Sequence, residues 1–211
     1  VAGSSVQDYL LETSRVTDQA NGERNFHIFY QVCAMFNGDA AYGMEVGANY
    51  AANFHYLGAG KREVRIDGVD DQTEMKETLS AMENLGFESN EVGALKNFVV
   101  GLLHCGDITF EPSEDHDGSD GSVVADASKL SLGVAARLLG LDPAALSRNL
   151  ITKPVKVMKE TVTQTLNPLK AAAARDSLTK AAYGRLFKWL VQRINIALRP
   201  AENIRHLVLT D

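Results

Sequence analysis

The chain has 211 residues, of which 45% are hydrophobic and 23% charged, as expected for one large globular domain or two small ones. No apolar run approaches the roughly 20 residues of a membrane helix, and the first residues lack the basic and apolar parts of a secretory signal. The net charge of -6 argues against a general nucleic-acid surface, and two cysteines are too few for a disulfide framework or zinc site, so we expect a reducing, cytoplasmic setting.

The first third of the chain predicts one strand, one helix and an irregular segment. Short alternation over residues 5–19 favours a strand, and the aromatic spacing over 23–36 favours a helix. Residues 37–68 are rich in Gly, Ala and Asn and predict short irregular helices and loops. The residues expected to tie the strand to the helix by charge pairs are Arg15, Glu23 and Arg24.

Cap residues and apolar spacing predict two helices in the middle of the chain. The first begins near Asp71 with a capping-box spacing and ends at Gly86, and the second begins at Ser89. Residues 107–110 predict a short strand. Residues 112–122 are acidic and rich in Gly and Ser, so they predict a surface loop.

Two further helices follow this loop. The first is expected from about 126 to 139, where Gly140 supplies a C-terminal cap. The second is short and opens at Asp142, an N-cap residue followed by Pro143 at the first helical position.

The last quarter of the chain predicts a hairpin or extended loop, a long helix and a strand. Residues 151–166 alternate with β-branched side chains, and Asn167 then opens a helix expected over about 169–198. Residues 206–211 predict a buried strand, which would need neighbouring strands from outside this sequence. The side chains expected on the buried side of the long helix are Leu178, Ala182, Leu186, Trp189, Leu190, Ile194 and Ala197.

Several sequence runs, kept in order and spacing along the chain, resemble the myosin motor domain from just after switch I to the first residue of switch II. The most specific run is ARDSLTKAAYGRLFKWLVQRIN at 174–195. The other runs are LLETSRV at 10–16, GERNFHIFYQ at 22–31, YLGAG at 56–60, DGVDDQTEM at 67–75, LGFESNE at 85–91, LLHCGDITFE at 102–111 and LLGLDPAAL at 138–146.

This resemblance implies that 1–211 is a partial motor domain, the upper actin-binding subdomain. The expected fold is α/β and helix-dominated, part of a P-loop-NTPase-type motor, with a few strands belonging to a larger central (transducer) sheet. The parent would be an actin-based, cytoskeletal motor that hydrolyses MgATP, with light chains or calmodulin on segments outside this sequence. The chain contains no Gly-x-x-x-x-Gly-Lys-Ser/Thr run, so we expect no ATP hydrolysis by these residues alone.

Asp211 would be the first residue of switch II, with indirect magnesium coordination as its role. Without the resemblance, an Asp at the end of an apolar strand is only a weak indication of a catalytic role. No metal is expected to bind directly to this segment.

The segment 151–169 corresponds to the cardiomyopathy loop, which touches F-actin in the family. Glu160 lies sixteen residues before Asp176, where the family places an acid or a phosphorylatable residue, so it would supply a built-in negative charge. An edge hairpin whose lysines discourage strand pairing is the alternative. The residues expected to contact actin are Lys153, Lys156, Lys159 and Glu160.

The acidic loop 112–122 corresponds to loop 4 of the family, a second possible actin contact through Glu114, Asp115 and Asp117. Actin is itself acidic, so a loop that makes no contact is an equal alternative.

A different function class is also compatible with the sequence. The chain would then be a stand-alone, motor-derived interaction module without ATPase activity, and sequence beyond both ends would discriminate between the two.

Overall fold

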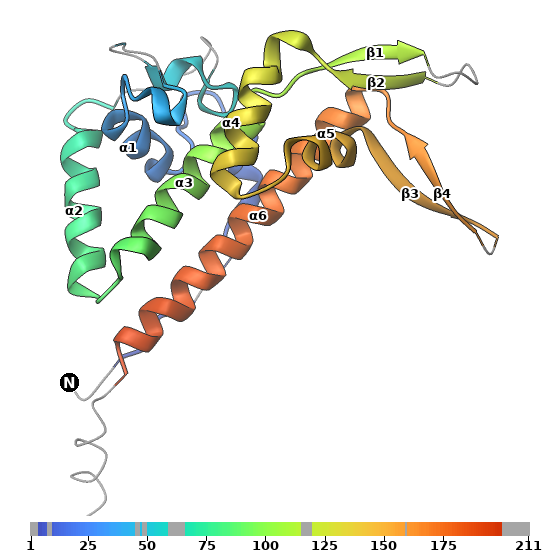
Figure 1. Ribbon diagram of the computed structural model, residues 1–211. Helices are drawn as coiled ribbons and strands as arrows, with labels where there is room; N and C mark the ends of the chain where they lie inside the picture. The colour runs from blue at the N-terminus through green and yellow to red at the C-terminus, as the bar shows by residue number, and fades with distance from the viewer. Residues whose placement is uncertain are drawn as a thin grey trace, which may run out of the picture.

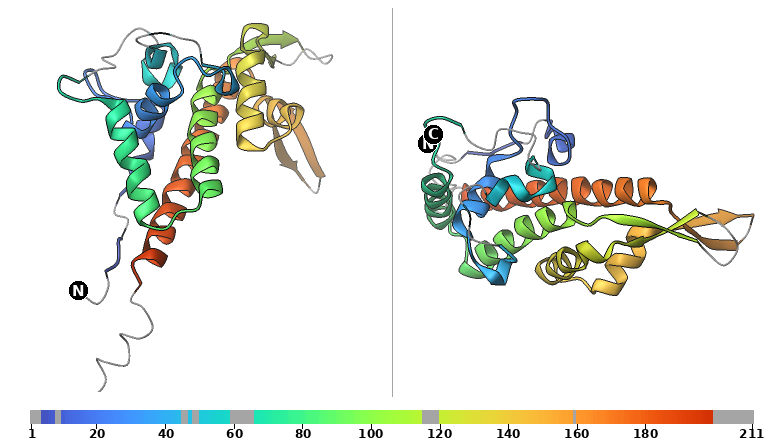
Figure 2. Two further views of the ribbon diagram at one scale, coloured as in Figure 1. Left: turned by 60° about the vertical axis from the view of Figure 1, so that its left-hand side comes forward. Right: turned by 90° about the horizontal axis from the view of Figure 1, so that it is seen from above.

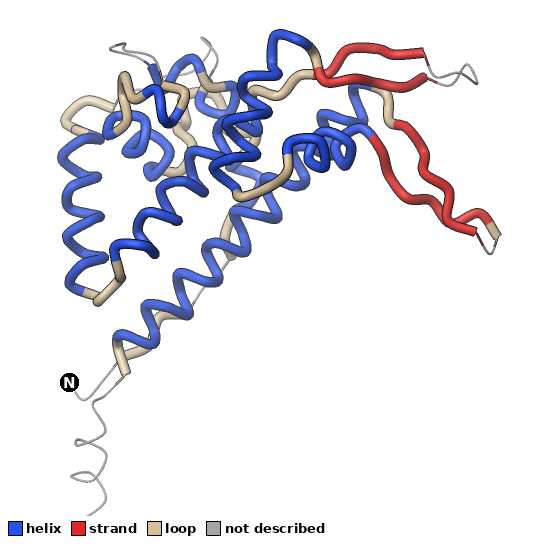
Figure 3. The backbone as a smooth tube through the Cα atoms, in the orientation of Figure 1, coloured by secondary structure: helices blue, strands red, loops and turns tan. Residues whose placement is uncertain are grey.

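The computed structural model describes residues 4–7, 10–44, 47, 50–58, 66–114, 120–158 and 160–199. Helices dominate these residues, and the strands form two small antiparallel hairpins (Figure 1, Figure 3). The α-helices are α1 (His27–Met35), α2 (Asp71–Asn84), α3 (Ser89–Gly106), α4 (Lys129–Leu139), α5 (Pro143–Ile151) and α6 (Pro168–Ala197). The strands are β1 (Phe110–Glu114), β2 (Asp120–Val124), β3 (Thr152–Val157) and β4 (Glu160–Thr165). Single 3-10 turns are η1 (Thr13–Val16), η2 (Ala40–Tyr42), η3 (Tyr50–Asn53), η4 (His55–Leu57) and η5 (Asp126–Ser128).

The long helix α6 is the axis on which the other elements are arranged. Helix α3 packs against it, with α1 and α2 on one side of α3 and α4 and α5 on the other (Figure 1, Figure 2). Both hairpins project from the end of the molecule where α6 begins. The body of the fold is therefore helical, and its strands are confined to one end.

Two apolar clusters form the core. The larger one lies among α1, α2, α3 and α6, and the smaller one lies among the end of α3, β2, α4 and α5 at the root of the hairpins. Gly106 ends α3 at a point where an added Cβ would lie 2.6 Å from the ring of Tyr56, so only glycine allows that ring to pack there. The buried residues of the smaller cluster are Cys105, Ile108, Val124, Ala135, Ala136, Leu146 and Leu150.

The predicted helix caps in the second half of the chain are confirmed. The Asp142 side chain accepts from the Ala145 amide at 2.7 Å, and Pro143 is the first residue of α5. The Asn167 side chain accepts from the Lys170 amide at 3.0 Å and starts α6. Each side chain satisfies one of the amides that a helix leaves unpaired at its N-terminus.

The strand predicted over 5–19 is wrong within its described residues, among which only Thr13–Val16 form a regular element, the turn η1. Arg15 stabilises this turn, because its guanidinium pairs with Glu12 at 2.8 Å and with Glu23 at 2.7 Å. Arg24, expected in the same group, pairs with Asp71 at 2.6 Å. The strand predicted over 206–211 lies outside the described residues.

The buried side of α6 differs from the predicted one. Its buried residues are Ala171, Arg175, Thr179 and Tyr183. Leu178 is 42% exposed and Trp189 is 39% exposed, so neither is a core residue among the described elements. Ala182 and Leu186 do pack, partly buried, against the larger cluster. The last turns of α6 extend beyond the other helices, as Figure 1 shows, although Arg193 pairs with Glu91 of α3 at 2.9 Å. Part of the apolar stripe of α6, including Trp189 and Ile196, stays exposed.

Among the described helices, none is by itself long and apolar enough to cross a membrane. The stretches 126–139 and 143–151 meet such a criterion only when taken together, across a bend of 113°.

Candidate functional site

The β3–β4 hairpin is the most exposed regular element of the described chain. Its strands pair antiparallel, from Thr152 opposite Thr165 to Val157 opposite Glu160. At the turn, Met158 is fully exposed and has a φ of 54°, a left-handed conformation that residues other than glycine rarely adopt. A two-stranded hairpin exposed to water on both faces is marginally stable by itself. Its position therefore depends on how its base is held.

The register separates the predicted actin-contacting residues onto two faces. Side chains alternate along a strand, and directly paired residues share a face. Lys153 and Glu160 therefore lie on the same face, whereas Lys156, opposite Thr161, lies on the other. All three are exposed, and Lys159 lies outside the described residues.

The base of this hairpin is joined to two helices and to the other hairpin. The Leu166 amide donates to the Ile151 carbonyl at 2.8 Å, which closes the base between α5 and α6. The hydroxyl of the buried Ser122 in β2 donates to the Leu166 carbonyl at 2.7 Å. These contacts give an exposed hairpin a buried root.

The predicted acidic loop 112–122 is corrected by the structure, because all of its described residues belong to the strands of the β1–β2 hairpin. Glu114 pairs with Asp120 next to the connecting residues 115–119, and Phe110 pairs with Val124 at the base. The strand predicted over 107–110 begins only at Phe110 and runs on to Glu114. Asp115 and Asp117 lie outside the described residues.

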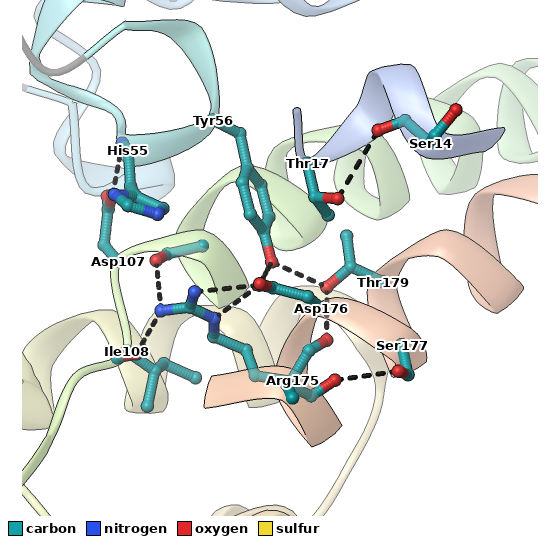
Figure 4. Close-up of polar contacts among 12 residues, drawn as sticks. Ser14, Thr17, His55, Tyr56, Asp107, Ile108, Arg175, Asp176, Ser177 and Thr179 are labelled. Atoms are coloured by element: carbon teal, nitrogen blue, oxygen red, sulfur yellow. Dashed lines mark hydrogen bonds and ion pairs between the residues drawn. The ribbon is translucent and has the colours of Figure 1, made fainter. Parts of the chain in front are cut away.

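Arg175 holds the connection between α3 and β1 against α6, as Figure 4 shows. Its Nη1 donates to the carbonyls of Gly106 at 2.9 Å and of Ile108 at 2.8 Å. Its Nε and Nη2 both reach Oδ1 of Asp176, at 2.9 Å and 2.8 Å. Arg175 is only 6% exposed, so its charge is compensated by this carboxylate and two carbonyls rather than by water.

Tyr56 adds a link from η4 to the same group of residues. Its hydroxyl donates to Asp176 Oδ1 at 2.7 Å and lies 3.3 Å from the Thr179 hydroxyl. The Thr179 hydroxyl in turn donates to the Arg175 carbonyl at 3.0 Å. Burial raises the pKa of Tyr56 above its ordinary value, so the hydroxyl remains a donor at neutral pH.

Asp107 follows α3 directly and faces the same charged group. Its carboxylate accepts from the His55 amide at 2.8 Å, visible in Figure 4. Burial raises the pKa of Asp107 to about 6, against the opposing effects of the His55 hydrogen bond and the Arg175 charge. This carboxyl therefore titrates within two pH units of neutrality, unlike an ordinary aspartate.

The sequence interpretation gave Arg175 no role, although it lies in the most specific of the resembling runs. A signal was available. Arg175 lies four residues from both Ala171 and Thr179 and eight from Tyr183, so it interrupts a stripe of small and apolar residues at helical spacing. A charge inside such a stripe indicates a buried residue with fixed partners.

Among the described residues, no group of three His, Cys, Asp or Glu side chains is arranged to hold a metal ion. Asp211 lies outside these residues, and the described residues do not show how a nucleotide would bind or be hydrolysed.

Comparisons with known proteins agree with the resemblance. The family model for the myosin head (motor domain) matches residues 1–209. Mouse unconventional myosin-Ib is 34% identical over 207 residues, 98% of this chain and 18% of the relative. Myosin-16 of Arabidopsis thaliana is 36% identical over 99% of this chain and 16% of its own length. For Myosin-52 of Schizosaccharomyces pombe the identity is 35%, over 94% of this chain and 12% of the relative. This chain spans less than a fifth of these relatives, and it belongs to the myosin head (motor domain) family.

Proposed function

We propose that this chain forms part of an actin-based, ATP-driven cytoskeletal motor and that its β3–β4 hairpin supplies part of the actin-contacting surface. Family membership supports the motor assignment. The observation that carries the surface assignment is a hairpin that exposes both faces while its root is buried. An element held this way can present side chains to a large partner without being absorbed into the core.

The charges on the hairpin suit recognition of an acidic filament. Lys153 and Lys156 project from opposite faces of β3, so the hairpin carries positive charge whichever face meets the partner. Glu160 places one negative charge at the start of β4, near the turn. Exposed charges of this kind act mainly on association rate and on salt dependence. Glu160 is therefore proposed as a residue that tunes actin affinity.

The nucleotide role of this segment is proposed from the family alone. Asp211 would coordinate magnesium indirectly in the parent motor and couple switch II to this subdomain. Light chains or calmodulin would bind segments outside this sequence. The acidic residues Glu114, Asp115 and Asp117 are proposed as a weaker, second contact with actin.

The surface assignment is tested in the full-length protein with Lys153→Glu and Lys156→Glu, each compared with Lys76→Glu on the exposed face of α2. We expect each hairpin variant to weaken actin co-sedimentation several-fold and to reduce its dependence on salt. Lys76→Glu should bind actin as the unmodified protein does. Equal binding by all three variants would show that actin contacts another surface.

A further inference from the structure

An apolar cavity of about 250 Å³ lies between four helices of the larger core cluster. Its walls come from Val32 in α1, Met75 and Met82 in α2, Val99 in α3 and Leu190 in α6. Apolar cavities of roughly 150 Å³ bind benzene, so this one has room for a molecule of two fused rings. It is separate from the hairpins and from the Arg175 group.

Three polar residues line this cavity, and two of them, Tyr183 and Lys96, are hydrogen-bond donors without an acceptor among the described residues. Tyr183 is 8% exposed, and its hydroxyl has no hydrogen-bond partner there. Burial raises the pKa of Tyr183 above its ordinary value, so the hydroxyl keeps its proton. Lys96 lies with its ammonium 5.8 Å from the Phe36 ring centroid and forms no ion pair with a described carboxylate.

The third polar lining residue does not compete for a ligand. The Thr78 hydroxyl bonds to the Glu74 carbonyl at 2.9 Å and to the Gln31 side-chain oxygen at 3.2 Å. Among the described residues, no Asp or Glu lines the cavity. Its free polar atoms therefore match an acceptor or an anion, and its walls match a flat hydrocarbon.

We propose that this cavity is a binding site for a small aromatic carboxylate of one or two rings. The rings would lie against the methionine and aliphatic side chains, and the carboxylate would accept from Lys96 and Tyr183. Most of the contact area would be apolar, with a few polar groups that fix orientation, as in small-molecule sites generally.

Methionine methyl groups provide the test, with 2-naphthoate as the probe. In the full-length protein, methyl-¹³C signals of Met75 and Met82 report on the cavity and are assigned by single Met→Leu variants. Met44, which is buried but does not line the cavity, and Met158, which is fully exposed, are internal controls. We expect saturable shifts at Met75 and Met82 and none at Met44 or Met158.

Two variants test the site and the ligand class separately. Leu79→Trp adds an indole to the cavity wall and should abolish the shifts, while an unchanged Met44 signal shows that the protein remains folded. Lys96→Gln should weaken 2-naphthoate binding about fivefold, the loss of one charge-assisted contact, and leave 2-methylnaphthalene binding unchanged.

Each alternative outcome overturns a stated part of the proposal. Non-saturable shifts, or shifts that also appear at Met44, would mean that the probe does not bind this cavity specifically. Binding that survives Leu79→Trp would place the ligand elsewhere. Equal binding of 2-naphthoate before and after Lys96→Gln would rule out recognition of the carboxylate.

Discussion

The Ser122 hydroxyl donates a 2.7 Å hydrogen bond to the Leu166 carbonyl, which joins β2 to the residue between β4 and α6. Both residues are buried, at 5% exposure each, so water does not readily replace the bond. The two hairpins thus share a fixed root, and the orientation of one constrains the other.

Ser122→Ala should destabilise the protein by about 1–2 kcal/mol, because it leaves the buried Leu166 carbonyl without this donor. Chemical denaturation followed by circular dichroism gives the change. Ser80→Ala, at an exposed position of α2, is the matched control and should change stability by less than about 0.5 kcal/mol. Equal stabilities of the two variants would contradict the role given to Ser122.

Arg175→Met should cost about 3–5 kcal/mol, because it removes one partner of a buried pair and leaves two carbonyls unpaired. Arg175→Lys keeps the charge but cannot reach Asp176 and both carbonyls with a planar fork, so its loss should be intermediate. Denaturant unfolding of the unmodified protein, Arg175→Lys and Arg175→Met measures the order of their stabilities. Retention of full stability in Arg175→Met would show that packing alone holds α3 and β1 against α6.

The stability contribution of Asp107 should fall as pH rises. Its carboxyl has a pKa of about 6 when folded and 3.8 as a model value, so the folded protein binds this proton more tightly. The contribution is therefore fully present below about pH 4 and is lost through pH 6. The free energy of unfolding of Asp107→Asn, relative to that of the unmodified protein, should rise by on the order of 2 kcal/mol between pH 4 and 7. Stability curves at several pH values give this difference. If the stability curves of Asp107→Asn and the unmodified protein run parallel with pH, the raised pKa of Asp107 is contradicted.

In the complete motor, Glu160→Lys should lower actin-activated ATPase while basal ATPase stays unchanged. This prediction rests on the proposal that the exposed charge at the start of β4 tunes actin affinity and has no part in nucleotide binding. Steady-state kinetics against actin concentration provide the measurement, with Glu83→Lys on α2 as the control. If actin activates the ATPase of Glu160→Lys normally, Glu160 is not part of the actin interface.

The isolated 211 residues should not bind MgATP, because the chain has no phosphate-binding loop. Titration calorimetry with micromolar nucleotide is the direct check. Saturable heat of binding in that range would overturn the expectation.

Local chemistry made several elements of this fold predictable. Asp142 and Asn167 each cap a helix whose first residue is proline, and Gly140 ends α4 with a φ of 68°. These signals depend on a few adjacent residues, so the sequence alone contains them. For the same reason, the alternating β-branched residues of β3 and β4 predicted a hairpin or an extended loop, and the structure has the hairpin.

Features that depend on distant partners were not predictable in the same way. The alternation over 5–19 resembles a strand, but Arg15 bonds to Glu12 and Glu23 in a turn instead. Apolar spacing predicted Trp189 as a core residue, but its ring packs edge-on against Phe87, with the centroids 6.2 Å apart, and stays 39% exposed. Arg175 is buried with its guanidinium bonded to the carbonyls of Gly106 and Ile108, and only the folded chain brings these distant residues to it.

Helix α6 also has a mechanical consequence. Its 30 residues span about 45 Å, and its first turns are bonded to the hairpin root. A rigid helix of that length that tilts by about 5° at the root moves its far end by about 4 Å. Arg193 near that far end pairs with Glu91 of α3 at 2.9 Å, so any such tilt of α6 would have to carry the start of α3 with it or break this ion pair.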